Sequence, residues 1–341
     1  MTSDDADYPI ELLYEFKRMF EKGQDFIAEG KYRKAIEIFR KAMEMTEPDE
    51  VVMNYIAECH LFLNQRDKGI AVLRKAIEIN PYYDEGLNNI SLLLTEKGNL
   101  KEAESYIRRA IEVSPTRSNS WWSLGRILYQ QGEFEEAMRV LATSVGLAPD
   151  NADAYHYLGL TLEHLGQIEK AERALHKAAE LGHDVAEIIS DYGRFLMRHD
   201  RPRDAIEVLQ QASEVDSYDY TILTSQAEAI IAVMREQDIP DREDLADRAM
   251  KALNQSLDLN PVYGKTWFHW GEITLFHRAW EKGERLFRHC IECGYEGPMA
   301  WAWLSLMVDK QGRKAEAEEI FEEFKRRRDA LEESGGTLDG R

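Results

Sequence analysis

The sequence predicts an all-α protein in which about nine helix pairs follow one another as structural repeats. Three features support this prediction. Turns centred on proline recur at an interval of 34 residues, two amphipathic runs of helical period lie between successive turns, and a glycine often separates the two runs. The chain of 341 residues also exceeds the roughly 250–300 at which one compact core stops growing. A stack in which each unit contacts only its neighbours accommodates this length without a second domain.

The second run of each repeat is the predicted helix that ends at the proline turn. Four turns of this type are centred on Pro81, Pro115, Pro149 and Pro261, and the first three prolines are 34 residues apart. The run before Pro115 keeps apolar residues at Ala103, Ile107 and Ala110, a spacing of three to four residues that is typical of one helix face.

The first run of each repeat is a second amphipathic helix, for example around Leu87, Ile90 and Leu94. A glycine follows this run in five repeats: Gly30, Gly98, Gly132, Gly166 and Gly312. Glycine at the end of a helix readily takes the left-handed conformation that lets the chain reverse. We therefore expect each glycine to separate two antiparallel helices.

These residues resemble the tetratricopeptide repeat. That family places a large aromatic residue at the fourth place, Leu and Gly at the seventh and eighth, Gly at the fifteenth and Ala at the twentieth. A large residue at the twenty-fourth place, Ala at the twenty-seventh and Pro at the thirty-second complete its pattern. The unit from Ser118 to Asn151 fits with Trp121, Leu124, Gly125, Gly132, Phe134, Ala137, Leu141 and Pro149. The unit from Ala152 fits with Tyr155, Leu158, Gly159, Gly166, Ala171, Leu175 and Ala178.

Extending this frame gives nine units over residues 16–324, which begin near Phe16, Glu50, Asp84, Ser118, Ala152, Ala186, Tyr220, Gly264 and Pro298. An acidic segment, residues 1–15, leads into the first helix. An insertion near residues 234–244 interrupts the seventh unit, and we expect an extended first helix there, followed by a projecting loop. The sixth unit has Asp200 in place of the inter-helix glycine, and the eighth has Tyr295 in place of the proline.

The resemblance implies a right-handed superhelical solenoid in which the first helix of each pair lines a concave groove. A charged C-terminal capping helix, residues 324–333, is expected to cover the final core face. Residues 325–341 then comprise the end of this helix and a flexible tail. Trp121, Trp267 and Trp301 occupy the fourth place and are expected to pack in the core.

Composition limits the classes of function. Sixty-three acidic and 43 basic residues give a net charge of −20, which opposes non-specific binding to nucleic acid or to an anionic membrane. Solubility of an elongated body also accounts for this charge. No apolar stretch reaches the roughly 18–20 residues of a membrane span, and the N-terminus does not resemble a secretory signal. Three cysteines exclude a disulfide framework, so we expect a cytoplasmic protein.

Motifs for catalysis or metal binding are weak. His289 precedes Cys290-x-x-Cys293, a spacing used by redox pairs and by half of some zinc sites. Both cysteines fall at core places of the repeat and no second such pair exists, so we expect buried structural cysteines. The sequence has no HExxH, glycine-rich phosphate loop or GxSxG motif, and we expect no catalytic residue, metal site or cofactor. The basic run at residues 325–328 is read as a solvated helix end rather than a nucleic-acid site.

Family resemblance places groove-lining residues at the second, fifth, ninth, twelfth and thirteenth places of each first helix. From the second to the sixth unit, the candidate partner-binding residues are Asn54, Glu58, Asn88, Trp122, Arg126, His156, Arg194 and Arg198. Asparagine can hold an extended peptide backbone through both donor and acceptor groups, and arginine can bind a carboxylate with two hydrogen bonds. Any solvated concave face has a similarly mixed composition, so this second interpretation stays open.

The function expected from the sequence is that of a cytoplasmic, non-catalytic scaffold that binds a protein or peptide in the groove. Trp122, Arg126, His156 and Arg194 are expected to converge on one stretch of the groove. A partner carrying a carboxylate beside an apolar residue would suit them. The alternative is a regulatory or substrate-selecting subunit of an enzyme encoded by another chain. Tetratricopeptide cochaperones of heat-shock proteins are a poor match, because only Asn89 fits their carboxylate-binding pattern. Direct nucleic-acid binding is disfavoured by the charge, no membrane association is expected, and the oligomeric state stays open.

Overall fold

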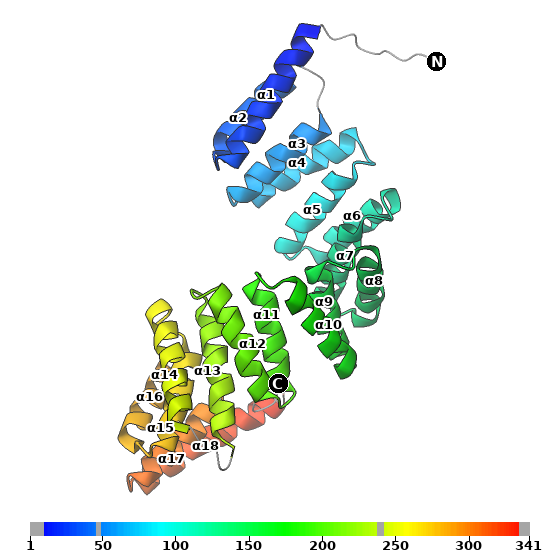
Figure 1. Cartoon of the computed structure of the whole chain (residues 1–341). Coiled ribbons are helices and arrows are strands. Elements are labelled where there is room, and N and C mark those ends of the chain that lie inside the picture. The colour runs from blue at the N-terminus through cyan, green and yellow to red at the C-terminus, as the bar shows by residue number, and fades with distance from the viewer. Residues whose placement is uncertain (1–9, 46–48, 237–241, 334–341) are drawn as a thin grey trace. The chain divides into compact units, whose positions relative to one another are not determined.

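The structure is a computed structural model that describes residues 10–45, 49–236 and 242–333. Over these residues the chain forms eighteen α-helices and no strand, which confirms the all-α prediction (Figure 1). The first helices of the nine pairs are α1 (Ile10–Ala28), α3 (Glu50–Phe62), α5 (Asp84–Glu96), α7 (Ser118–Gln131), α9 (Ala152–His164), α11 (Ala186–Arg198), α13 (Tyr220–Met234), α15 (Gly264–Phe276) and α17 (Met299–Lys310). The second helices are α2 (Tyr32–Met43), α4 (Arg66–Ile79), α6 (Leu100–Val113), α8 (Phe134–Leu147), α10 (Ile168–Leu181), α12 (Pro202–Val215), α14 (Arg242–Leu259), α16 (Trp280–Glu292) and α18 (Lys314–Glu333).

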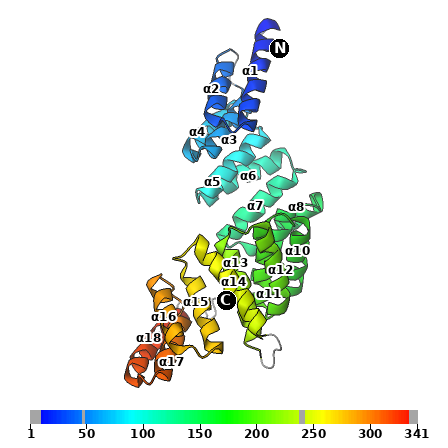
Figure 2. The ribbon, with the colours of Figure 1, turned by 60° about the vertical axis from the view of Figure 1, so that its left-hand side comes forward.

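The nine repeats are divided between two compact units, with the boundary inside α10. From here on, the first unit means residues 1–174 and the second unit means residues 175–341. Within each unit the two helices of a pair lie side by side and antiparallel, as both views show (Figures 1 and 2). In the first unit, a continuous apolar core runs through α3 to α8 and includes Leu87, Ile107 and Leu141, all fully buried. In the second unit, Phe287, Leu304 and Met307 form the core of the last two pairs.

The reversal between the two helices of a pair uses a left-handed residue at the fifteenth place. Gly30, Gly98, Gly132, Gly166 and Gly312 have φ between 69° and 83°, so the predicted role of these glycines is confirmed. Asn64, Asp200 and Arg278 occupy the same place in other repeats and adopt φ of 56°, 56° and 50° without a glycine. The backbone reversal is therefore kept even where the side chain makes it unfavourable.

Glycine at the eighth place lets the two helices of a pair approach closely. A Cβ atom added at Gly125 would lie 2.4 Å from Cγ of Leu141, and one added at Gly271 would lie 2.7 Å from Cζ of Phe287. Leu141 and Phe287 both occupy the twenty-fourth place, sixteen residues after the glycine. The small and large residues of the repeat pattern are thus packing partners.

The proline turn also holds the fourth-place tryptophan. The indole N–H groups of Trp121 and Trp267 donate to the carbonyl oxygens of Pro115 and Pro261, each over 2.8 Å. Trp301 is half-buried at the same place, but its Nε1 is buried without a hydrogen-bond partner among the described residues. The residue six places before it is Tyr295 rather than a proline, and the guanidinium of Arg327 lies 4.9 Å from the Trp301 ring instead.

Two boundaries differ from the sequence expectation. Helix α1 begins at Ile10, six residues before the expected start at Phe16, because residues 10–15 are rich in leucine and glutamate, which favour helix. The capping helix is not a separate element, since α18 continues unbroken from Lys314 to Glu333. The inserted loop with Pro240 and the predicted tail lie outside the described residues. Beside the insertion, α13 has 15 residues and α14 has 18.

The prediction of two buried cysteines is right for Cys290 and wrong for Cys293. Cys290 is fully buried on α16, where burial first and the charges of Cys293 and Glu272 second raise its thiol pKa well above the ordinary value. Cys293 follows the last residue of α16 and is partly exposed, with its Sγ 3.7 Å from Nε2 of His289. The helix ends before Gly294, which has φ of 80°, so Cys293 falls on the terminal turn rather than in the core.

Candidate functional site

The first helices of the first unit carry the predicted asparagines, which bond between repeats. Nδ2 of Asn54 donates to Oε1 of Glu58 over 3.1 Å, and its Oδ1 accepts from Nδ2 of Asn89 over 2.7 Å. Asn88 donates to the carbonyl of Asp84 over 2.8 Å and accepts from the Ser120 hydroxyl over 3.0 Å. These amides connect successive first helices, so a partner's backbone would compete with internal hydrogen bonds for them.

Glu58 lies beside Asn54 and is partly buried. Burial raises the pKa of its carboxyl above the ordinary value, the hydrogen bond from Asn54 opposes this, and the charge of Glu85 adds to it. The carboxyl group of Glu58 is therefore easier to protonate than a solvated one.

Trp122 and Arg126 form the most distinctive pair of the first unit. They are four residues apart on α7, so they share a helix face, and the Arg126 guanidinium carbon lies 5.2 Å from the Trp122 ring centroid. Nε1 of Trp122 and Nε of Arg126 are both buried, and neither has a hydrogen-bond partner in the described part of the chain. Two adjacent N–H donors, one of them cationic, therefore lack an acceptor.

An aromatic ring from α9 lies against Trp122. Tyr157 meets Trp122 edge-on with a centroid distance of 6.5 Å, and the same tyrosine lies 5.3 Å from the ring of His156. His156 itself is buried, with 4% of its surface exposed. The structure thus brings Trp122, Arg126 and His156 to one aromatic cluster within the first unit.

Arg194 and Arg198 lie on α11 in the second unit. The guanidinium of Arg194 bonds Oδ1 of Asp191 on the same helix, with Nε at 3.1 Å. Its charge also acts on Tyr263 at the start of α15. The pKa of Tyr263 is raised chiefly by burial, while the charges of Lys265 and Arg194 act in the opposite direction. Convergence of Arg194 with Trp122, Arg126 and His156 stays a prediction.

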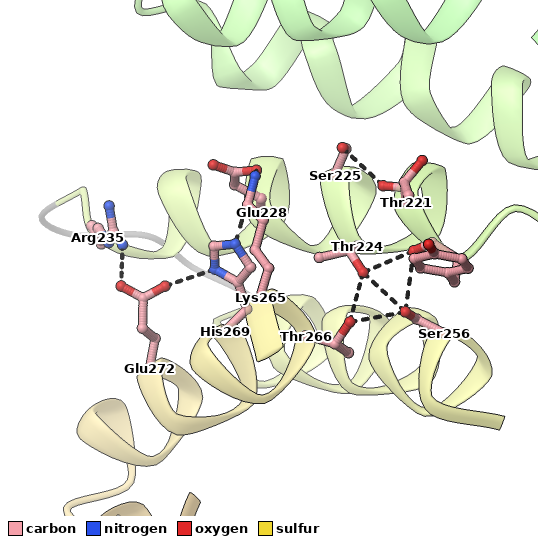
Figure 3. A network of polar contacts seen from close by, with 11 residues as sticks. Thr221, Thr224, Ser225, Glu228, Arg235, Ser256, Lys265, Thr266, His269 and Glu272 are labelled. Carbon is pink, nitrogen blue, oxygen red and sulfur yellow. Dashed lines mark hydrogen bonds and ion pairs between the residues drawn. The ribbon is translucent and has the colours of Figure 1, made fainter. Parts of the chain in front are cut away.

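A polar network that was not predicted lies between α13, α14 and α15 (Figure 3). At its centre, the buried hydroxyls of Thr224, Ser256 and Thr266 form a triangle with oxygen–oxygen distances of 2.9, 2.9 and 3.0 Å. Thr224 also donates to the carbonyl of Tyr220 over 2.8 Å. These bonds tie the seventh repeat to the eighth.

A row of charged side chains continues from this triangle along α13 and α15. Arg235 bonds Oε1 of Glu272, and Oε2 of Glu272 lies 2.9 Å from Nδ1 of His269. Nε2 of His269 lies 3.9 Å from Oε2 of Glu228, which in turn accepts from Nζ of Lys265 over 2.7 Å. The side chain of Glu272 is only 2% exposed, so its oxygens depend on these partners for hydrogen bonds.

Glu228 remains ionised in this row. Burial raises the pKa of its carboxyl, but the charges of His269, Lys265 and Arg235 together with the hydrogen bond from Lys265 lower the pKa by more. The net pKa lies below the ordinary value.

The sequence contained a signal for this row. Lys265 occupies the second place of its repeat, and Glu228 and Glu272 occupy the ninth places of theirs. The groove-lining places that selected Glu58 and Arg126 select all three residues when they are applied to the seventh and eighth repeats. The role of His269 had no such signal, because it stands at a sixth place and depends on the contact between α13 and α15.

Across residues 10–45, 49–236 and 242–333, no group of three or more His, Cys, Asp or Glu side chains is arranged to hold a metal ion. None of the described helices combines the length and apolar character that crossing a membrane requires.

Comparison with protein families finds tetratricopeptide repeats. Residues 26–85 and 94–160 match one pattern of this repeat, and residues 152–181 match another. No curated protein is similar enough in sequence to count as a relative.

Solved structures share the fold. PilF of Pseudomonas aeruginosa is 18% identical with a TM-score of 0.55, and the match covers 64% of this chain and 99% of that chain. A chain in the structure of the APC/C hetero-tetramer Cut9–Hcn1 is 15% identical with a TM-score of 0.58, over 85% of this chain and 55% of that chain. YrrB, described as a TPR protein with an unusual peptide-binding site, is 19% identical with a TM-score of 0.42, over 57% of this chain and 95% of that chain. At such identities the first two similarities concern the fold alone.

Proposed function

Since this chain is a tetratricopeptide repeat protein, we propose that it is a non-catalytic scaffold that binds a protein or peptide partner along its first helices. The observation that carries the proposal is the Trp122–Arg126 pair on α7. The partner segment presents an acidic side chain or a C-terminal carboxylate next to an apolar residue.

The two N–H groups explain the preference for a carboxylate. A buried donor without an acceptor costs about 1–3 kcal/mol, and a partner that supplies the acceptor recovers this energy. No ion pair of the described residues includes Arg126, so its charge is available to a carboxylate. Hydrogen bonds from guanidinium to carboxylate are among the stronger ones in proteins.

The surroundings of the pair suit the apolar neighbour of that carboxylate. The rings of Trp122 and Tyr157 are partly exposed and offer apolar contact area. Asn88 and His156 lie at the fifth places of the preceding and following repeats, where they extend the proposed surface. Asn54 and Glu58 occupy groove-lining places of the second repeat, and Arg194 and Arg198 occupy such places of the sixth repeat.

The experiment begins with affinity purification and mass spectrometry of the full chain, followed by calorimetric titration with the partner so identified. Interfaces concentrate binding energy in a few Trp and Arg residues worth about 2 kcal/mol or more each. We therefore expect Trp122→Ala or Arg126→Ala to weaken binding roughly thirtyfold with a nearly unchanged thermal midpoint.

The control is Arg139→Ala on α8, which removes an exposed arginine from a second helix. This variant should bind normally. Normal binding by both α7 variants, combined with loss of binding through substitutions on second helices, would contradict the proposal and move the working surface to the other face of the pairs.

A further inference from the structure

The second unit holds an imidazole that is buried but only half satisfied. The side chain of His269 on α15 is 5% exposed, and Nε2 has no hydrogen-bond partner among the residues described. Its other nitrogen, Nδ1, lies 2.9 Å from Oε2 of Glu272. A buried ring nitrogen without a partner is uncommon in native proteins and calls for a physical explanation.

The partners of His269 define what Nε2 can do. Glu272 also accepts from Arg235, so it acts as a carboxylate acceptor toward both neighbours. The proton between Glu272 and His269 therefore belongs to Nδ1, so Nε2 is an acceptor when the ring is neutral and carries an N–H when the ring is protonated. Nε2 lies 3.9 Å from Oε2 of Glu228, too far for a shared proton. In the neutral form of the ring, two acceptors thus stand side by side with no donor between them.

A cation from the same helix covers one of these acceptors. Nζ of Lys265 lies 2.7 Å from Oε2 of Glu228, and the side chains of Lys265 and Glu228 are 35% and 34% exposed. An ion pair with this exposure contributes little to stability. Lys265 can therefore leave toward solvent at little cost when a stronger donor arrives.

We propose that Glu228 and His269 form a second binding site, which takes the guanidinium of an arginine side chain of a protein partner in place of Lys265. A guanidinium carries several N–H donors in a rigid plane, so it can bond a carboxylate oxygen and a ring nitrogen together. The net charge of −20 attracts a basic partner segment. Beside Lys265, the rings of Tyr220 and Tyr263 lie 4.9 Å apart and offer contact to the stem of the arginine.

This site is independent of the proposed carboxylate site, because it lies in the second unit and prefers the opposite charge. Arg126→Ala, which tests the first unit, should leave arginine binding unchanged. Failure of one proposal is thereby distinguishable from failure of the other.

The test uses the full-length chain with its histidine rings labelled with carbon-13, and follows the ring signal of His269 by NMR. His269→Gln assigns that signal. The probe is N-acetyl-arginine amide. N-acetyl-lysine amide is the ammonium counterpart, N-acetyl-citrulline amide is the neutral isostere, and N-acetyl-aspartate amide is the acidic arm. We expect a saturable shift of the His269 signal with the arginine probe, a weaker effect with lysine, and none with the other two.

Three variants make the test specific. Lys265→Gln removes the internal competitor and should tighten arginine binding about two- to fivefold. Glu228→Gln removes the charged acceptor and should weaken it at least about tenfold, with unchanged helical circular dichroism. Lys251→Gln on α14 makes the same charge change at an exposed position and should have no effect. Equal binding of arginine and citrulline, a shift caused by the aspartate probe, or weaker binding in Lys265→Gln would each overturn the proposal.

Discussion

Replacement of Gly132 by alanine isolates the energy of the left-handed turn. Gly132 caps α7 with φ of 81° and ψ of 12°, and nothing lies within 4 Å of the Cβ atom that alanine would add. The only native-state penalty is backbone strain of about 1–2 kcal/mol. Alanine also reduces the entropy of the unfolded chain, which returns about 0.4–1 kcal/mol. We expect a net loss of stability of about 1 kcal/mol.

The opposite substitution at the same place of another repeat should change stability in the opposite direction. Arg278 has φ of 50°, and its side chain is exposed. Arg278→Gly removes the strain and should stabilise the chain by about 1 kcal/mol. Gly146→Ala is the control for the substitution itself, because Gly146 is helical, exposed and uncrowded, and alanine there should stabilise by up to about 1 kcal/mol.

Urea denaturation followed by circular dichroism measures all three variants, and an unchanged slope confirms that the unfolding transition is comparable. Because neighbouring repeats unfold as coupled units, each variant is compared with the parent chain rather than with the other variants. A stable Gly132→Ala together with a destabilised Arg278→Gly would refute the left-handed turn at the fifteenth place and with it the common hairpin geometry of the repeats.

Three further predictions concern packing, thiol chemistry and pH. Gly271→Ala places a Cβ atom 2.7 Å from Cζ of Phe287 and should lower stability by about 1–3 kcal/mol, read from the urea midpoint. In the native chain a thiol reagent should label Cys293 and leave Cys290 unmodified until unfolding, as read by mass spectrometry, since burial raises the pKa of the Cys290 thiol. Burial raises the pKa of Glu284, but hydrogen bonds from three neighbours lower it below 4.5 overall. The contribution of the Glu284 carboxylate to stability should therefore be present above pH 4.5 and be lost as the pH falls through its lower pKa in the folded chain. Glu284→Gln should flatten this acid dependence of stability in denaturation curves.

The periodic parts of the fold followed from the sequence, because each repeat position has one packing task. The spacing of prolines, glycines and apolar residues was enough to place the helix pairs and the reversal at Gly132. Conformation was harder to infer where the residue type changed, as at Arg278, since the backbone obeys the repeat while the side chain does not. The ends of the repeat array were less predictable, because no described repeat precedes Ile10 and none follows Glu333 to fix a boundary.

The candidate site was only partly accessible to sequence reasoning. The place rule identified Trp122 and Arg126, and their shared helix face follows from a spacing of four residues. The place rule could not show that Asn54 bonds Asn89 of the next repeat, because that contact depends on how two first helices pack. The interaction of His269 with Glu228 has the same origin, since it joins α13 to α15 across 41 residues of sequence.

Site-specific photocrosslinking in cells tests the central claim most directly. A photoreactive amino acid replaces Asn119, an exposed residue three positions before Trp122 on α7, or Arg139, an exposed residue on α8. If the first helices bind the partner, a protein should crosslink at position 119, not at position 139, and the crosslink should disappear when Arg126→Ala is added. Crosslinking at position 139 alone, or a crosslink at position 119 that survives Arg126→Ala unchanged, would contradict the account.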